Sequence, residues 1–116
     1  MLFEIERTTV LGRPAVRVRG ELDIATAPRL AEAVDAQLAT SPSSMVIDLT
    51  ETTFMDSSGA RQLARSARAA TGSGVPLQVV CPQENRPVRL VIDLLELQAL
   101  VPVVEAARGI DGVVGP

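Results

Sequence analysis

The sequence predicts an α/β fold: a mixed sheet of four to five strands, sandwiched against helices packed mainly on one face. Apolar residues recur at every second position in some segments and at every third or fourth in others, which are strand and helix signals. These segments alternate as β-β-α-β-α-β-α, with a further strand and helix to follow. Because β-α-β crossovers are right-handed, the helices are expected to stack on one face. The 116 residues fit one compact domain.

The first two strand patterns are expected to form a hairpin. Apolar and charged side chains alternate in residues 3–6 and again in 16–19, as in strands with one face in water. Residues 11–14, Leu-Gly-Arg-Pro, supply turn chemistry between them. Opposite charges should then face each other across the exposed side. The expected pairs are Glu4 with Arg19 and Glu6 with Arg17.

A helix and the central strand come next. The stretch 20–25 leaves the second strand, and a helix is expected to open near Thr26 with Pro28 in its first turn. Residues 41–44, Ser-Pro-Ser-Ser, end that helix. Residues 45–49 alternate again, with an apolar flank that indicates a buried strand.

The tetrapeptide Asp56-Ser57-Ser58-Gly59 marks the change from strand to helix periodicity. A short polar connection, residues 50–55, leads into it. Ser57 is a candidate helix N-cap, a role that Asp56 or Ser58 can share, and Gly59 allows close packing. A hydroxyl at a positive helix end is also where an added phosphate is tolerated. The two interpretations are compatible.

The last third of the chain predicts a strand, a helix and a short strand. Residues 77–81 alternate as a fourth strand, and a third helix follows with Asn85 as cap and Pro87 at its start. This helix is apolar around more than half its circumference. Residues 100–104 indicate a short edge strand and 105–108 a helical turn. The domain is expected to span 1–108, with 109–116 as a flexible tail.

The core stripe of the third helix is expected to be Val88, Val91, Ile92 and Leu95. A flanking stripe comprises Leu90, Leu94 and Leu97. That second stripe is interpreted either as core beneath the tail or as a dimer surface.

Composition narrows the function. The net charge of −3 argues against nucleic acid as the main partner, and the 2% of aromatic residues leaves no base-stacking platform. The single cysteine, Cys81, suits a reducing compartment. No signal peptide or membrane span is recognisable, so we expect a soluble cytoplasmic protein without membrane insertion.

The sequence also excludes several catalytic sites. It contains no histidine, and all eleven basic residues are arginine, so histidine-based triads and lysine chemistry are impossible. No glycine-rich phosphate loop is present. Asp23, Asp48 and Asp56 are the one combination that could hold magnesium at a sheet edge. We therefore expect no enzyme activity and no cofactor or metal.

Four motifs together resemble the STAS domain, and more narrowly the bacterial anti-sigma factor antagonists. They are Gly-Glu-Leu-Asp at 20–23, Ile-Asp-Leu at 47–49, Phe-Met-Asp-Ser-Ser-Gly at 54–59 and Val-Val-Cys-Pro at 79–82. The resemblance implies a STAS-type sandwich. It also implies that the serine after the aspartate, here Ser57, is phosphorylated by an anti-sigma factor that is itself a serine kinase.

The resemblance implies a partner switch. The unmodified protein would bind the anti-sigma factor and release the sigma factor, and phosphorylation would prevent binding until a PP2C-type phosphatase reverses it. The partner-binding residues implied are Asp23, Ile24, Thr26, Asp56, Ser57, Ser58, Gly59, Arg61 and Arg65. The expected oligomeric state is a monomer or weak dimer. Two alternative functions are an accessory subunit of a membrane transporter and a non-switched scaffold of a stress-signalling assembly.

The sequence departs from the family pattern at two places. The third helix usually ends with a small residue and glycine, whereas Leu95-Glu96-Leu97 stands here. Leucine often follows the Ser-Gly of the corner, whereas this chain has Ala60-Arg61. Arg61 begins a basic stripe on the second helix with Arg65 and Arg68. This stripe is interpreted either as a solvated face or as contacts for an acidic partner.

Overall fold

Six strands and three α-helices make up residues 3–109, the part of the chain that the computed structural model describes. The strands are β1 (Glu4–Val10), β2 (Arg13–Leu22), β3 (Met45–Asp48), β4 (Thr52–Met55), β5 (Leu77–Val80) and β6 (Val103–Val104). The helices are α1 (Ala27–Leu38), α2 (Ser57–Gly72) and α3 (Arg86–Leu94), with 3-10 turns at Leu97–Ala99 and Ala107–Gly109. Except for Gly109, which ends the last turn, the expected tail 109–116 lies outside the described residues.

The strands form one mixed sheet in the order β1-β2-β3-β5-β6, with β4 beside β2. Among the strands of residues 3–109, the β1–β2 pair is antiparallel and the other pairs are parallel. The predicted fold class is confirmed, with six strands instead of four or five.

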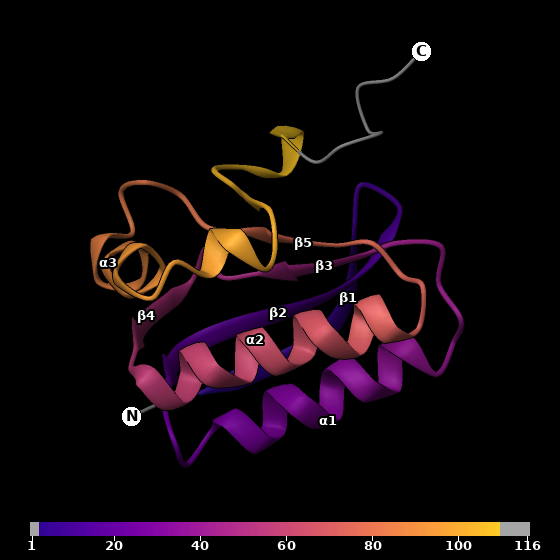
Figure 1. Cartoon of the computed structure of the whole chain (residues 1–116), viewed down its shortest axis with the longest axis horizontal. Helices are drawn as coiled ribbons and strands as arrows, with labels where there is room; N and C mark the ends of the chain where they lie inside the picture. Colours follow the sequence, from indigo (N-terminus) through magenta and orange to yellow (C-terminus); the bar gives the residue numbers. More distant parts are fainter. Residues whose placement is uncertain (1–2, 110–116) are drawn as a thin grey trace.

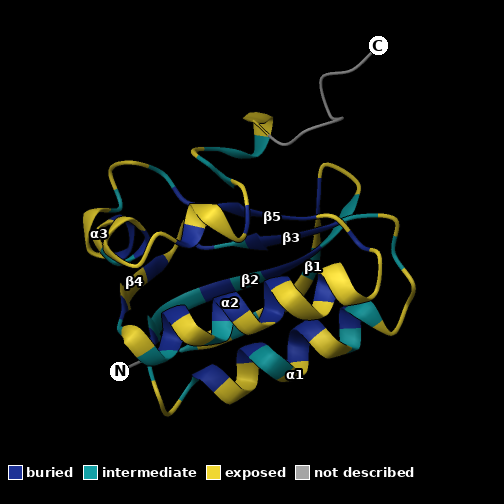
Figure 2. Ribbon diagram, viewed as in Figure 1, coloured by how far each residue is buried: buried dark blue, intermediate teal, exposed yellow. Residues whose placement is uncertain are grey.

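The helices cover one face of this sheet. In Figure 1, α1 and α2 run side by side along the sheet, and α3 lies at the end near β4. Their buried side chains join those of β2, β3 and β5 in one apolar core that includes Leu30, Leu63, Ile92, Ile47 and Val79. Figure 2 shows the outward sides of α1 and α2 as exposed, as expected for amphipathic helices.

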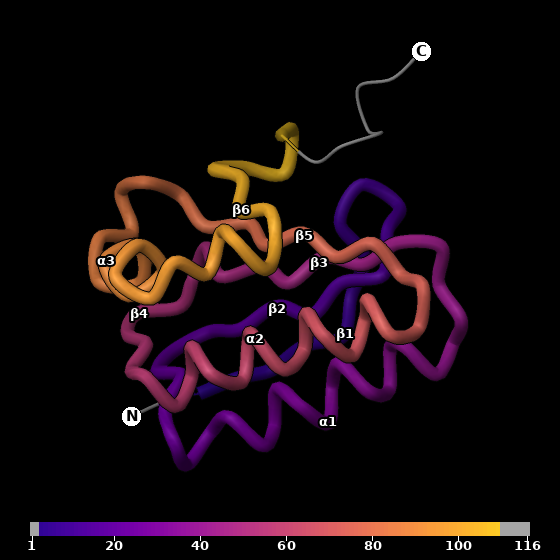
Figure 3. Tube along the Cα trace, in the orientation of Figure 1, coloured from indigo at the N-terminus to yellow at the C-terminus, as the bar shows by residue number. Residues whose placement is uncertain are grey.

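The other face is divided between a small apolar cluster and a charged network. The cluster contains Val10, Ala15, Val46 and Val80, and Ala107 of the last turn packs against it. In Figure 3 the segment 105–109, after β6, accordingly lies on the side of the sheet away from α1 and α2.

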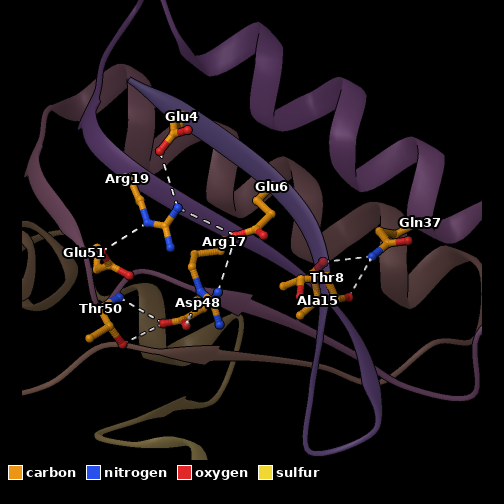
Figure 4. Close-up of polar contacts among 10 residues, drawn as sticks. All are labelled: Glu4, Glu6, Thr8, Ala15, Arg17, Arg19, Gln37, Asp48, Thr50 and Glu51. Carbon is orange, nitrogen blue, oxygen red and sulfur yellow. Dashed lines mark hydrogen bonds and ion pairs between the residues drawn. The ribbon is translucent and has the colours of Figure 1, made fainter. Parts of the chain in front are cut away.

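The predicted hairpin and its charge pairs are confirmed. Leu11 and Gly12 both have positive φ, 49° and 80°, as in the two-residue turns that suit the twist of a hairpin. The register places Glu4 opposite Arg19 and Glu6 opposite Arg17. Guanidinium–carboxylate distances are 3.4 Å in both pairs (Figure 4).

Gln37 ties α1 to this hairpin. Its side chain is buried, and its Nε2 donates to the carbonyl oxygen of Ala15 at 2.8 Å and to that of Thr8 at 3.3 Å (Figure 4). Its Oε1 accepts from Arg7 Nε at 3.2 Å. A buried amide with both ends bonded fixes the angle between helix and strands.

Residues 50–55 are not the polar connection that the sequence indicated. They contain β4, and β2 correspondingly runs on to Leu22 to pair with it. The pairing shifts register after Gly20, whose φ is +96°. The hydroxyl of Thr52 can be buried at little cost, because it donates to the carbonyl oxygen of Val18 at 2.9 Å. A threonine that looks polar in the sequence thus belongs to the sheet.

The third helix also differs from the prediction. Val88 and Ile92 are buried, Val91 is half-buried and Leu95 is exposed. Of the flanking stripe, Leu97 is buried, whereas Leu90 and Leu94 are exposed. The difference arises because α3 ends at Leu94 and Glu96 turns the chain in a left-handed conformation, φ +52°.

Asn85 precedes α3 as predicted, but its side chain does not cap the helix. Its Nδ2 donates instead to the carbonyl oxygens of Leu49 and Thr52, at 3.1 and 2.8 Å. Asn85 therefore connects the start of α3 to the turn between β3 and β4.

Candidate partner-binding site

Two parallel strands end side by side and place both candidate segments at one edge of the sheet. Leu22 at the end of β2 is paired with Met55 at the end of β4. The residues that follow, Asp23 and Asp56, therefore leave the sheet together. The backbone N–H of Asp56 also donates to the carbonyl oxygen of Leu22, at 3.3 Å. The first turns of α1 and α2 consequently start next to each other.

Asp56, and not Ser57, is the N-cap of α2. Its Oδ1 accepts hydrogen bonds from the backbone N–H groups of Ser58 and Gly59, at 2.9 and 3.0 Å. The carboxylate can reach both donors because they lie two and three residues further on. Ser57 is thus the first helical residue; it is exposed, and its hydroxyl has no hydrogen-bond partner among the described residues. Ser58 is half-buried.

Gly59 is present because α2 approaches β2 closely. A Cβ atom at this position would collide with the carbonyl oxygen of Leu22 and lie 2.9 Å from side-chain carbons of both Leu22 and Met55. The prediction that glycine allows close packing here is confirmed. The packing brings the start of the helix against the end of the sheet.

The turn before α1 is fixed in a similar way by Asp23 and Thr26. Oδ1 of Asp23 accepts from the backbone N–H groups of Ala25 and Thr26, at 3.0 and 3.1 Å. The Thr26 hydroxyl donates to the carbonyl oxygen of Glu21 and accepts from the N–H of Asp23, both at 2.8 Å. Ile24, at the tip of this turn, is 76% exposed.

A cleft of about 260 Å³ lies between the two helix starts. Of the predicted site residues, Ile24, Ser58, Arg61 and Arg65 line it. Pro28 and Gln62 also line it, and sequence reasoning missed both. Residues 58, 62 and 65 lie on one face of α2, and this helical spacing could have predicted that Gln62 belongs to the site.

The structure also separates residues that hold the site from residues that partners can reach. The Thr26 side chain forms hydrogen bonds within the domain and Gly59 is buried, so both residues maintain the structure of the site and are not direct partner contacts. Arg61, Arg65 and Arg68 are exposed, and within residues 3–109 none of them forms an ion pair. These arginines are therefore available to an external anion.

The magnesium hypothesis is not supported. Asp48 lies on the other face of the sheet, where it accepts from Arg17 Nε at 3.3 Å and from the Thr50 hydroxyl at 2.6 Å (Figure 4). In the part of the chain that the structure describes, no three acidic, cysteine or histidine side chains come together to bind a metal.

Cys81 does not supply a nucleophile at this site. It is fully buried, and burial raises its pKa to about 11, so the thiol stays protonated near neutral pH.

Across the described residues, no helix combines the length and apolar character needed to cross a membrane.

The geometry agrees with comparisons to known proteins. Residues 4–108 match the family model of the STAS domain. No curated protein matches the chain at a significant level.

Three solved structures illustrate the likeness. An anti-sigma factor antagonist from Mycobacterium paratuberculosis is 29% identical, with a TM-score of 0.69 over 90% of this chain and 86% of that chain. A putative anti-sigma factor antagonist from Thermotoga maritima is 20% identical, with a TM-score of 0.70 over the same shares. The anti-sigma factor antagonist SpoIIAA, in its unphosphorylated form, is 18% identical, with a TM-score of 0.63 over 94% of this chain and 100% of that chain. The last two show the shared fold alone. Because the family model spans nearly all of the sequence, the chain belongs to the STAS domain family.

Proposed function

We propose that this protein is an anti-sigma factor antagonist that binds a serine-kinase anti-sigma factor through the corner between β4 and α2. Binding releases the sigma factor, and phosphorylation of Ser57 turns binding off. A PP2C-type phosphatase restores the unmodified protein. The protein acts by binding and not by catalysis, in the cytoplasm of a bacterium.

The observation that carries the proposal is the division of roles between Asp56 and Ser57. Because Asp56 supplies the helix cap, the Ser57 hydroxyl is exposed and has no partner within residues 3–109. A kinase can therefore modify Ser57 without breaking a hydrogen bond of the fold. Ser58 is half-buried against the cleft and offers a poorer substrate.

Electrostatics supports a switch by blocking. A phosphate adds about −1.5 to −2 charges at neutral pH. The N–H groups of Ser58 and Gly59 already bind Asp56, but the positive end of the α2 dipole still favours negative charge at this position. The folded domain therefore needs no large rearrangement. At an interface, the same charge has to be desolvated or meets the partner's own charges. Such a mismatch costs several kcal/mol, and about 1.4 kcal/mol corresponds to tenfold in affinity.

The neighbouring surface supports a protein partner with acidic groups. Ile24 projects from the rim of the cleft as an apolar contact, and Arg61 and Arg65 lie beside it without ion pairs in the described part of the chain. Oδ1 of Asp23 and Oδ1 of Asp56 each accept two backbone hydrogen bonds. The groups proposed to meet a partner are chiefly the Ile24 side chain, the guanidinium groups of Arg61 and Arg65, and the Ser57 hydroxyl.

The decisive experiment is phosphorylation by the cognate kinase. The protein is incubated with ATP and each serine-kinase anti-sigma factor of its own organism, and its intact mass is measured. We expect one added phosphate, abolished in Ser57→Ala and retained in the matched control Ser58→Ala. Absence of modification by all of these kinases, with co-purification of a transporter ATPase, would favour the transporter subunit instead. Stable binding without modification would favour the non-switched scaffold.

A measurement of binding between the unmodified protein and the anti-sigma factor tests the partner surface by charge reversal. Arg65→Glu should weaken binding of the unmodified protein on the order of tenfold, because it opposes an acidic partner at the cleft. Arg68→Glu lies on the same helix outside the cleft and should bind as the wild type does. Equal losses in the two variants would argue against the cleft as the contact.

A further inference from the structure

A second cleft lies at the carboxyl ends of β5 and β6. Its volume is about 700 Å³, and Pro82, Arg89, Val104 and Glu105 contribute to its lining. The two strands are parallel, with Val80 opposite Val104, so the chain leaves both at the same edge. In α/β sheets, this is the edge at which small ligands bind.

The floor of this cleft contains a buried arginine. Arg89 of α3 is only 6% exposed, and its Nε donates to the carbonyl oxygen of Cys81 at 3.0 Å. Its two terminal nitrogens, Nη1 and Nη2, have no hydrogen-bond partner and no ion pair among residues 3–109. In that part of the chain no fully buried side-chain nitrogen or oxygen lacks a partner, so these two nitrogens keep some exposure, and Arg89 lines the cleft.

A buried guanidinium without a counter-ion is unfavourable. It loses most of its hydration, and a single carbonyl contact compensates only part of that loss. The bond from Nε to Cys81 also fixes the plane of the guanidinium, so the two free nitrogens present a preorganised fork. Such a fork matches the two oxygens of a carboxylate or phosphate group.

We propose that this cleft binds a small molecule through one carboxylate or phosphate group, held by Arg89. The exposed rim carries Glu84 and Glu105 as well as Arg108. Two carboxylates beside one arginine repel a highly charged ligand, so the rim favours a single anionic group over a polyphosphate. The site uses none of the residues of the partner-binding surface, and the inference stands independently of the proposed function.

The test is an NMR titration of the full chain with two simple probes, inorganic phosphate and acetate, at constant ionic strength. We expect the Arg89 Nε–H signal and the amides of Gln83 and Glu105 to shift saturably, with dissociation constants in the millimolar range. The tighter probe identifies the preferred group. Arg89→Gln should weaken binding at least about tenfold, since it removes the charge-assisted pair.

Two further variants separate binding from folding. Arg86→Gln, on the same helix but outside the cleft, should bind both probes as the wild type does. Arg89→Lys retains a charge without the fork and should bind weakly while remaining folded by circular dichroism. Shifts that never saturate in the wild type, or that saturate equally in Arg89→Gln or Arg89→Lys, would overturn the proposal.

Discussion

At the scale of single residues, the corner around Ser57 divides its side chains into two groups. Asp23 and Asp56 point inward and satisfy backbone donors at the starts of α1 and α2. Ile24 and Ser57 point outward. Substitution of an inward residue therefore costs stability as well as binding, whereas substitution of an outward residue should change binding alone. This distinction matters when any variant at the corner is interpreted.

Gly59 gives the sharpest residue-scale prediction. Gly59→Ala should destabilise the protein by about 1–3 kcal/mol, because the new Cβ collides with the carbonyl oxygen of Leu22. The matched control is Gly72→Ala at the other end of α2, where a Cβ meets nothing within 4 Å. That change should stabilise by about 0.4–1 kcal/mol. Urea unfolding followed by circular dichroism measures both, and equal effects would contradict the packing argument.

The corner was only partly predictable from the sequence. The residue types marked a helix start, but Asp56, Ser57 and Ser58 are all good caps, and residue type does not choose among them. The choice depends on where the helix begins, which the β2–β4 pairing sets by ending β4 at Met55. The residues that pair are more than 30 positions apart in the sequence, so a local pattern cannot reveal the pairing.

At the scale of elements, hydrophobic periodicity predicted the strands and helices whose apolar residues repeat regularly. The predicted elements include β1, β2, β3, β5, the short edge strand β6 and all three helices, but β4 was missed. The four residues of β4 include Thr52, whose burial depends on a hydroxyl bond to Val18. Periodicity also carried α3 three residues too far, to Leu97, because the left-handed turn at Glu96 leaves no mark in a hydrophobic pattern.

Glu96 provides the element-scale prediction. It is exposed, and its φ of +52° is a conformation in which a side chain is strained and glycine is not. Glu96→Gly should therefore stabilise the protein by about 0.5–1 kcal/mol. Glu96→Ala keeps the Cβ and serves as the control, with no comparable gain. Chemical denaturation of both variants measures the difference, and equal stability would contradict strain at this turn.

At the scale of the whole molecule, the set of ionisable groups is unusually small. The chain has no histidine, lysine or tyrosine, and all its basic residues are arginine. Histidine, the side chain whose ordinary charge change falls near neutral pH, is thus missing from the chain. A phosphate on Ser57, with its second pKa near 6, would add a group that titrates there.

The buried thiol of Cys81 gives a whole-molecule prediction at alkaline pH. Burial raises its pKa from 9.0 to about 11 in the folded state, so the unfolded chain loses the thiol proton first. The stabilisation is fully present below pH 9 and is lost as the pH rises to 11, by about 1.4 kcal/mol per unit. Denaturant unfolding at several pH values between 8 and 11 should show this fall in the wild type. Cys81→Val lacks the thiol and should show a nearly constant free energy of unfolding, whereas an equally steep fall in that variant would exclude Cys81 as the cause.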